Sequence, residues 1–144
     1  MTGNELIIWN DDLVTGVDKI DDQHRILVNS INDANIRLAS NCSAEILDQI
    51  SRDLLSYALY HFETEEELME EFGYAETHAN DSDLHLNQHR EFSSKVVNVR
   101  EGIKSGHLIS REDLLTFLNN WLINHILKTD KRLGAFILAQ KNVA

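Results

Sequence analysis

The sequence predicts an all-α fold: an up-down-up-down antiparallel four-helix bundle with an extended N-terminal arm and a short C-terminal helical piece. Three observations support this prediction. The 144 residues contain no proline, the residue that interrupts helices most strongly. Four segments carry apolar residues spaced by threes and fours, which places them on one face of a helix. Short connections join the segments, as in antiparallel bundles.

The first two helices are predicted over residues 20–39 and 44–72. Ser43 can cap the second helix with its hydroxyl, and Gly73 follows the last residue, where glycine is favoured. Each helix carries a histidine within a largely apolar stripe. The stripes are Ile20, His24, Leu27, Ile31, Ala34 and Leu38 in the first helix, and Leu47, Ile50, Leu54, Tyr57, His61, Leu68 and Phe72 in the second.

The second half of the chain predicts two more long helices and a short one. Residues 74–82 are polar and predict a loop. The third helix begins near His85 and ends at Gly106, the fourth opens at the cap residue Ser110, and residues 133–138 predict a last helical piece. Their inward positions are His85, His89, Phe92, Val96, Val99 and Ile103 in the third helix, and Leu114, Leu118, Trp121, Leu122 and His125 in the fourth.

The segment before Gly16 has no helical periodicity. We expect it to form an extended arm, with Leu6, Ile8 and Trp9 packed on the bundle. No linker, repeat or low-complexity stretch divides the chain, so residues 1–144 are predicted to form a single domain.

The composition limits the classes of partner. The formal net charge is −11, from 24 acidic and 13 basic residues, and such a surface repels phosphate backbones and anionic lipids. Cys42 is the only cysteine, so no internal disulfide can form, as in proteins of a reducing cytosol. The N-terminus lacks the pattern of a signal peptide, and no stretch has the length of a membrane span. We therefore expect a cytoplasmic protein without nucleic-acid or membrane partners.

Five of the seven histidines lie on the inward stripes: His24, His61, His85, His89 and His125. A single inward histidine is most often a hydrogen-bonded core residue. Five facing each other are hard to satisfy, because each neutral imidazole brings one donor and one acceptor. A metal ion resolves this, since it accepts a lone pair from each ring. The other two, His78 and His107, are expected to face solvent in loops.

Carboxylates accompany these histidines at short spacings. His61 and Glu65, like His85 and His89, are four residues apart and therefore share a helix face. Asp130 follows His125 by five residues, near the predicted end of the fourth helix. Five imidazoles and two carboxylates exceed the needs of one tetrahedral zinc ion and suit a pair of ions. Nitrogen and oxygen donors without thiolate favour iron, while manganese and zinc remain open.

These motifs resemble those of the hemerythrin family, in particular its single-domain bacterial members. The resemblance covers nearly the whole chain, although residues 74–84 form a longer connection than is usual for the family. The matching segments are Trp9-Asn-Asp11, Gly16-Val17, Ile20-Asp-Asp-Gln-His24, His61-Phe-x-x-Glu65-Glu66-x-Leu68-Met69, His85-x3-His89-x2-Phe92 and Trp121-Leu122-x2-His125-Ile126-x3-Asp130.

The resemblance implies a set of metal ligands. One iron would be held by His85, His89 and His125, and the other by His24 and His61, which leaves the second iron an open position. Glu65 and Asp130 would bridge the two irons, with an oxo or hydroxo group as a third bridge. The irons would alternate between Fe2+ and Fe3+.

The same resemblance implies surroundings for the site. Leu122, Ile126 and Ala58 would form an apolar oxygen pocket that excludes water. Trp9 and Trp121 are expected near the site, and ordinary core packing is an equally good interpretation of both.

The function implied is reversible binding of dioxygen, for storage, delivery or scavenging, and not enzymatic turnover. The alternatives are a di-iron enzyme with peroxidase, oxidase or nitric-oxide-handling activity, and an oxygen or redox sensor that acts through a separate partner. Besides dioxygen, an unidentified reductase or oxygen-using enzyme is an expected partner. The acidic surface is compatible with a monomer, while members of the family assemble in several ways.

Overall fold

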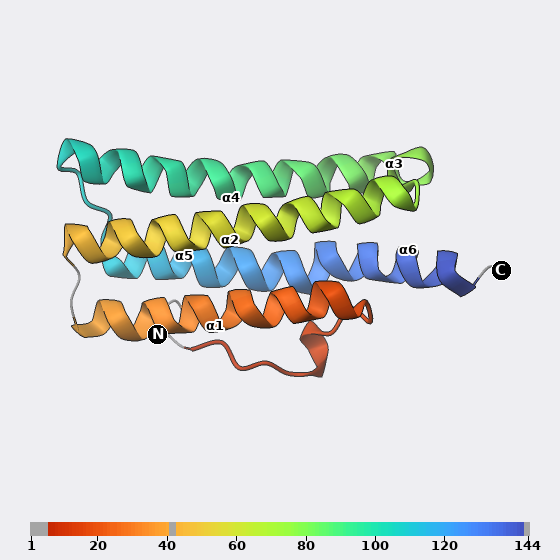
Figure 1. Cartoon of the computed structure of the whole chain (residues 1–144), viewed down its shortest axis with the longest axis horizontal. Coiled ribbons are helices and arrows are strands. Elements are labelled where there is room, and N and C mark those ends of the chain that lie inside the picture. Colours follow the sequence, from red (N-terminus) through yellow and green to blue (C-terminus); the bar gives the residue numbers. More distant parts are fainter. Residues whose placement is uncertain (1–5, 41–42, 143–144) are drawn as a thin grey trace.

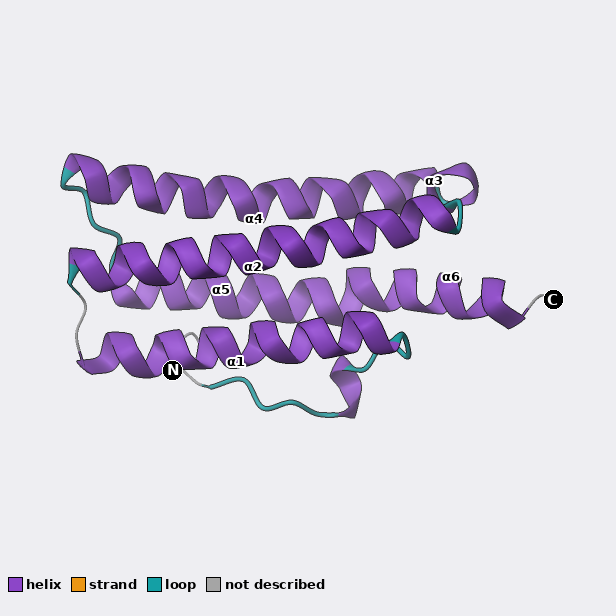
Figure 2. Ribbon diagram, viewed as in Figure 1, coloured by secondary structure: helices purple, strands orange, loops and turns teal. Residues whose placement is uncertain are grey.

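The computed structural model describes residues 6–40 and 43–142, and within these ranges every regular element is a helix. The predicted all-α class is therefore confirmed, whereas Cys42 lies outside the described residues. Four helical rods lie side by side (Figures 1 and 2). The colours of Figure 1, which follow the sequence, show that successive rods run in alternating directions. The rods are α1 (Asp18–Ser40), α2 (Ala44–Glu71), α4 (Ala79–Ser105), and the continuous run of α5 (Arg111–Asn124), η2 (His125–Asp130) and α6 (Lys131–Asn142).

Polar caps define the helix ends that the sequence predicts. The hydroxyl of Ser43 accepts a hydrogen bond from the backbone N–H of Ile46 at 3.3 Å, and that of Ser110 accepts one from Asp113 at 3.0 Å. These oxygens satisfy N–H groups that have no partner inside their own helix. At the other ends, α2 is followed by Gly73 and α4 by Gly106, both in the left-handed conformation. The predicted capping residues are thus confirmed.

The start of α1 is held by a buried carboxylate. Asp21 accepts hydrogen bonds from the backbone N–H of Thr15 at 2.8 Å and of Gly16 at 3.1 Å. The Thr15 hydroxyl also donates to this carboxylate, at 2.8 Å. Because His24 lies one turn further along α1, these bonds also set the position of the first site histidine.

The predicted loop over residues 74–82 is wrong. These residues form the short helix α3 (Tyr74–Thr77) and the first turn of α4. The buried Tyr74 ring stacks on His78 at 5.4 Å, and both rings pack against Phe136, at 4.9 Å and 5.0 Å. The tertiary contacts with Phe136 thus stabilise a helix that local polarity disfavours. Asp81 lies in the first turn of α4, where a negative charge is favourable.

The N-terminal arm is extended up to the 3-10 turn η1 (Asp11–Leu13), as predicted, but its packing differs from the prediction. Ile7 and Trp9 pack on the core, whereas Leu6 and Ile8 are 49% and 79% exposed. Successive side chains of an extended chain point in opposite directions, so only one set can face the helices. The Asn32 side chain fixes this register, because it donates to the Ile7 carbonyl and accepts from the Ile7 N–H, both at 2.8 Å.

The fourth rod continues past the predicted end of the fourth helix. The predicted helical piece over residues 133–138 lies within α6, which follows η2 without a break. The segment η2 is a π-helix, whose wider turn inserts one extra residue into the run. Asp130 therefore lies inside a continuous helical segment and not in a turn beyond a helix end.

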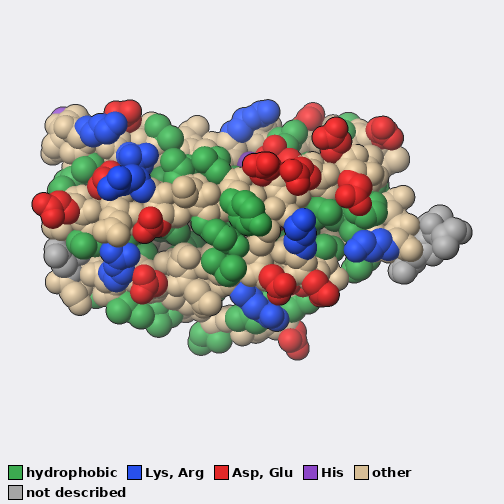
Figure 3. Space-filling model, viewed as in Figure 1, with side chains coloured by type: hydrophobic (Ala, Val, Ile, Leu, Met, Phe, Trp, Pro, Cys, Tyr) green, Lys and Arg blue, Asp and Glu red, His purple; other side chains and the backbone are tan. Residues whose placement is uncertain are grey.

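The surface and the interior follow the expected division of side chains. Acidic, basic and apolar side chains are interspersed on the face shown in Figure 3. The larger core cluster includes Phe62, Phe92 and Leu122, and a smaller one around Tyr74 and Leu133 joins α6 to α1 and α2. Within the described ranges, no helix combines the length and the apolar character that crossing a membrane requires.

Candidate metal centre

The structure brings the seven predicted ligand residues together at the centre of the helices. His24 comes from α1, His61 and Glu65 from α2, His85 and His89 from α4, and His125 and Asp130 from η2. All seven are buried, and none is more than 3% exposed. The helical spacing of four residues aligns the pairs on α2 and α4.

The π-helical segment aligns the last pair. In an α-helix, residues five apart diverge by more than a quarter of a turn. In η2 the wider turn places His125 and Asp130 on the same side, with the His125 Nε2 and Asp130 Oδ1 atoms 3.0 Å apart. In the π-helix, two residues five apart therefore lie on the same side, as two residues four apart do in the α-helix α2.

The five Nε2 atoms surround the two carboxylates. The Glu65 Oε1 atom lies 3.0 Å from the Nε2 of His89, 3.2 Å from that of His85 and 3.4 Å from that of His61. Asp130 lies 2.7 Å from the Nε2 of His24 through Oδ2, and 3.1 Å from that of His85 through Oδ1. Every imidazole therefore presents the same nitrogen to the same small volume.

The donors fall into two sets. One consists of Glu65, His85, His89 and His125, and the other of His24, His61, Glu65 and Asp130. Within each set, one ligand atom per residue lies within 4.8 Å of the others. Glu65 belongs to both, so two ions held by these sets would share a carboxylate.

Unpaired atoms show that this cluster fits metal ions better than a hydrogen-bond network. The Nε2 atoms of His24, His61 and His125, both oxygens of Asp130, and Oε2 of Glu65 are buried without a hydrogen-bond partner. Some of these atoms are close to one another, but their angles do not suit hydrogen bonds. Buried polar atoms without partners are costly, and metal coordination would satisfy them all at once.

The pKa values of the histidines show the charge that the site requires. Burial lowers the pKa of His61 to about 4, although Glu65 opposes this shift. For His24 and His85 burial acts in the same direction, but the carboxylates of Asp130 and Glu65 outweigh it and raise the pKa values to about 9 and about 10. Without metal, protons on these rings would balance the two buried carboxylates.

The carboxylates show the reciprocal effect. Burial alone would raise the pKa of Glu65, but the surrounding histidines, His61 foremost, hold it well below its usual range. Burial and Glu65 would raise the pKa of Asp130, but His125 and His24 lower it. Both groups are therefore anionic at neutral pH, and cations are the ligands that the centre favours.

Comparison with known proteins agrees with this geometry. The family model described as "Hemerythrin HHE cation binding domain" matches residues 15–137. The chain belongs to the hemerythrin family. The solved structure described as wild-type hemerythrin superposes with a TM-score of 0.80 at 28% identity, covering 92% of this chain and 98% of that one. A buried cluster of histidine and carboxylate ligands in a hemerythrin domain suits a non-haem di-iron site.

Curated hemerythrin relatives cover most of the chain. The bacteriohemerythrin of Stenotrophomonas maltophilia (strain R551-3) is 35% identical over 137 residues, which is 95% of this chain and 85% of that protein. The bacteriohemerythrin of Pseudomonas aeruginosa (strain LESB58) is 35% identical over 86% of this chain and 76% of its own length. The myohemerythrin of Theromyzon tessulatum is 27% identical over 85% and 86%, respectively.

Two glutamines orient histidines of the buried cluster, and neither role was predicted from the sequence. Thr64 donates its hydroxyl hydrogen to the Tyr60 carbonyl and accepts from the Gln23 Nε2 at 3.1 Å. This leaves Gln23 Oε1 facing the His61 Nδ1 at 2.7 Å, so Nδ1 carries the proton and Nε2 presents its lone pair. The signal in the sequence is weak, since Gln23 simply precedes His24.

Gln88 has the matching role on the other side of the site. Its Oε1 accepts from the His125 Nδ1 at 2.6 Å and from the Thr129 hydroxyl at 2.7 Å. The contact joins α4 to η2, two elements far apart in sequence. Because it crosses between helices, periodicity within one helix could not predict it.

His89 is held differently from the other rings. Its Nδ1 donates to the Glu66 Oε2 at 2.9 Å, and its face stacks on Phe62 with ring centroids 4.0 Å apart. This hydrogen bond lowers the pKa of Glu66. Neither residue was predicted to touch a ligand, although both belong to the hemerythrin-like segment at residues 61–69.

The two tryptophans differ in their positions. Trp121 stacks on His125, with ring centroids 4.5 Å apart and planes inclined by 14°. Trp9 packs on the core from the arm, where the Arg25 guanidinium lies 5.0 Å over its ring. Trp121, which was predicted to lie near the site, thus contacts His125 directly. Trp9 instead packs the N-terminal arm onto the core.

The remaining predicted residues lie as follows. Ala58, Leu122 and Ile126 are buried in the larger core cluster, which also contains Phe62. His78 and His107 are exposed, as expected, but His78 lies between two helices and not in a loop.

Proposed function

We propose that this chain binds dioxygen reversibly at a non-haem di-iron centre, for storage, delivery or scavenging of oxygen. One observation carries the proposal: five imidazole nitrogens surround two buried carboxylates in two donor sets. We also propose that residues 1–144 form one domain, an up-down-up-down antiparallel four-helix bundle. The alternating rods in Figure 1 support this topology.

The donor sets suggest which residues hold which iron. His85, His89 and His125 would hold one iron, and His24 and His61 the other. Glu65, which belongs to both sets, would bridge the two irons. Asp130 would bridge them as well, because its Oδ1 lies 3.1 Å from the His85 Nε2 and 3.0 Å from the His125 Nε2 of the first set. The second set has one imidazole fewer, so it leaves a coordination position for an external ligand. When bound, two ferrous ions supply the electrons that dioxygen accepts on binding and returns on release.

The chain contributes dryness and orientation. Ala58, Leu122 and Ile126 are buried and apolar, and they would exclude water, a proton source that promotes irreversible oxidation. Gln23 and Gln88 hold the Nδ1 protons of His61 and His125, so these rings present only their Nε2 lone pairs.

The relatives support binding over turnover. Those compared above are named bacteriohemerythrin and myohemerythrin, and hemerythrins are oxygen-binding proteins. An electron donor that restores the ferrous state, and an oxygen-using enzyme that receives the cargo, remain the expected partners.

Two measurements test the proposal. Metal analysis of the protein loaded anaerobically with ferrous iron should find two irons per chain. Exposure to air should then produce a visible absorption band that disappears on degassing, over repeated cycles. A band that does not reverse would refute reversible binding, and rapid consumption of added peroxide would favour the enzyme alternative.

A further inference from the structure

Glu66 connects the buried centre with the solvent. It follows the bridging residue Glu65 in α2, but successive residues of a helix point about 100° apart, so its side chain leaves the core. Its side chain is 45% exposed, whereas that of His89 is 3% exposed. The 2.9 Å contact between Oε2 and Nδ1 thus joins a surface carboxylate to a ligand ring.

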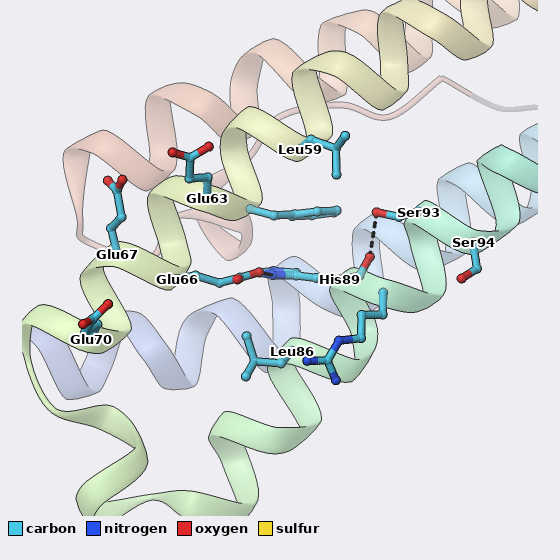
Figure 4. Close-up of a pocket in the computed structure, with 11 residues that line it drawn as sticks. Leu59, Glu63, Glu66, Glu67, Glu70, Leu86, His89, Ser93 and Ser94 are labelled. Atoms are coloured by element: carbon cyan, nitrogen blue, oxygen red, sulfur yellow. Dashed lines mark hydrogen bonds and ion pairs between the residues drawn. The ribbon is translucent and has the colours of Figure 1, made fainter.

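The contact lies in a groove between α2 and α4. The groove has a volume of about 640 Å³, and Figure 4 shows Glu66 reaching toward His89 along the plane of its ring, between Leu59 and Leu86. Other carboxylates line the same wall on α2, namely Glu63, Glu67 and Glu70. Among the described residues, Glu66 is the only one of these four glutamates that forms an ion pair with a histidine of the site.

The outer contacts of the five rings are unequal. His61 and His125 each face a neutral glutamine oxygen. The Nδ1 atoms of His24 and His85 are buried without a hydrogen-bond partner among the described residues. His89 alone of the five has a carboxylate at Nδ1 in the described structure, so one donor set has a charged outer contact and the other does not.

We propose that Glu66 is a positioning residue of the di-iron centre, which orients His89 through Nδ1 and stabilises the oxidised state of the iron that His89 would bind. This proposal rests on the proposed function. Phe62 stacks on the face of the ring and fixes its plane, while Glu66 fixes its rotation within that plane. Together they leave Nε2 directed at Glu65, 3.0 Å away.

The effect on the metal follows from charge. A carboxylate that accepts the Nδ1 proton makes the imidazole a stronger donor, and a ferric ion benefits more from this than a ferrous ion. The negative charge of Glu66 also acts directly on the ion, with partial screening because the carboxylate reaches solvent. Both effects lower the reduction potential.

The test separates orientation from charge with three variants and a matched control. Glu66→Gln keeps an acceptor oxygen of the kind that Gln88 offers to His125, but it removes the charge. Glu66→Ala removes both the acceptor oxygen and the charge, and Glu66→Asp keeps the charge on a shorter side chain. Glu67→Gln removes the same charge from the same groove wall, where the described structure gives Glu67 no hydrogen bond or ion pair with a site histidine.

Three readouts apply: ferrous iron affinity by anaerobic competition with a chromophoric chelator, reduction potential by spectroelectrochemistry, and the exchange of the His89 Nδ1 proton with solvent by ¹⁵N NMR of zinc-loaded protein. We expect Glu66→Ala to lose about tenfold in affinity and to exchange this proton faster, because its acceptor is gone. Glu66→Gln should retain slow exchange and shift the potential upward. Glu66→Asp should restore the potential in part, and Glu67→Gln should match the wild type in all three.

The outcomes are distinguishable. Equal potential shifts in Glu66→Gln and Glu67→Gln would overturn the proposal, as would wild-type affinity and wild-type exchange of the His89 Nδ1 proton in Glu66→Ala. Either result would leave the proposed function standing if the wild type holds two irons and binds oxygen reversibly. A wild type that does not hold two irons would refute the proposed function, and the proposal on Glu66 with it.

Discussion

At the scale of single residues, the site depends on which nitrogen each imidazole offers. All five rings turn Nε2 inward, and three of them have the Nδ1 proton held by a side chain from another position. A ring without such a contact can rotate or change tautomer. Residues that never touch the metal are therefore expected to control its affinity.

Gln23 provides a prediction at this scale. Gln23→Ala should weaken metal binding about tenfold, because His61 loses the acceptor that holds its Nδ1 proton. Chelator competition measures the loss. Gln49→Ala, at an exposed position of the same helix as His61, is the control and should bind as the wild type does. Equal affinities in both variants would contradict a role for Gln23.

At the scale of elements, the π-helical segment η2 decides whether the fourth rod directs one or two side chains into the buried cluster. It compensates for a spacing of five residues between His125 and Asp130. The segment also keeps α6 in contact with the smaller core cluster, since Leu133 and Ile137 remain buried. One local irregularity thus serves both the site and the packing beyond it.

Changes in the length of η2 test this interpretation. One alanine inserted after Lys128, an exposed position, should turn Asp130 by about 100° and abolish the binding of a metal pair. Deletion of Lys128 should convert the segment into an α-helix with a spacing of four, as in His61 and Glu65, and should retain more metal. Metal analysis and circular dichroism report the two effects. Full occupancy in the insertion variant would refute the role of η2.

At the scale of the whole molecule, four helical rods enclose two carboxylates at a depth where water cannot solvate them. Neutral imidazoles do not balance this charge. In the metal-free chain protons must do so, because Asp130 and Glu65 raise the pKa of His24 to about 9 and that of His85 to about 10, against the effect of burial. Metal uptake is therefore coupled to proton release.

This coupling predicts the pH dependence of metal binding. Both pKa values lie above neutrality, so both rings are charged at pH 7. Burial lowers the pKa of His125, but Asp130 and Glu65 outweigh it and raise this pKa too, so metal must displace about two protons or more. Affinity should rise with pH and level off as pH passes about 9 to 10. Calorimetry in buffers of different ionisation enthalpy counts the protons. The His24→Ala variant should release about one proton fewer on binding metal, and the control His107→Ala should release the same number as the wild type. If the wild type released no protons at pH 7, the coupling would be refuted.

Much of this protein could be predicted from the order of its residues. Periodicity is a property of single helices, so the four rods, their caps and the inward histidines follow from local spacing. Predictions failed where a distant contact outweighs a local preference. Tyr74 packs on Phe136 and makes a polar segment helical, and Asn32 selects Ile7 over Ile8 as the buried residue of the arm.

The sequence by itself determined the helical class, the donor types and the residues that carry them, since these depend on composition and on spacing within one helix. Only the tertiary structure decided how the donors divide into two sets, how η2 brings Asp130 beside His125, and which side chains hold the Nδ1 protons. The reason is physical. The rotation of one helix against another depends on how all their side chains pack together, and the contacts of Gln23, Gln88 and Glu66 exist only once that rotation is set.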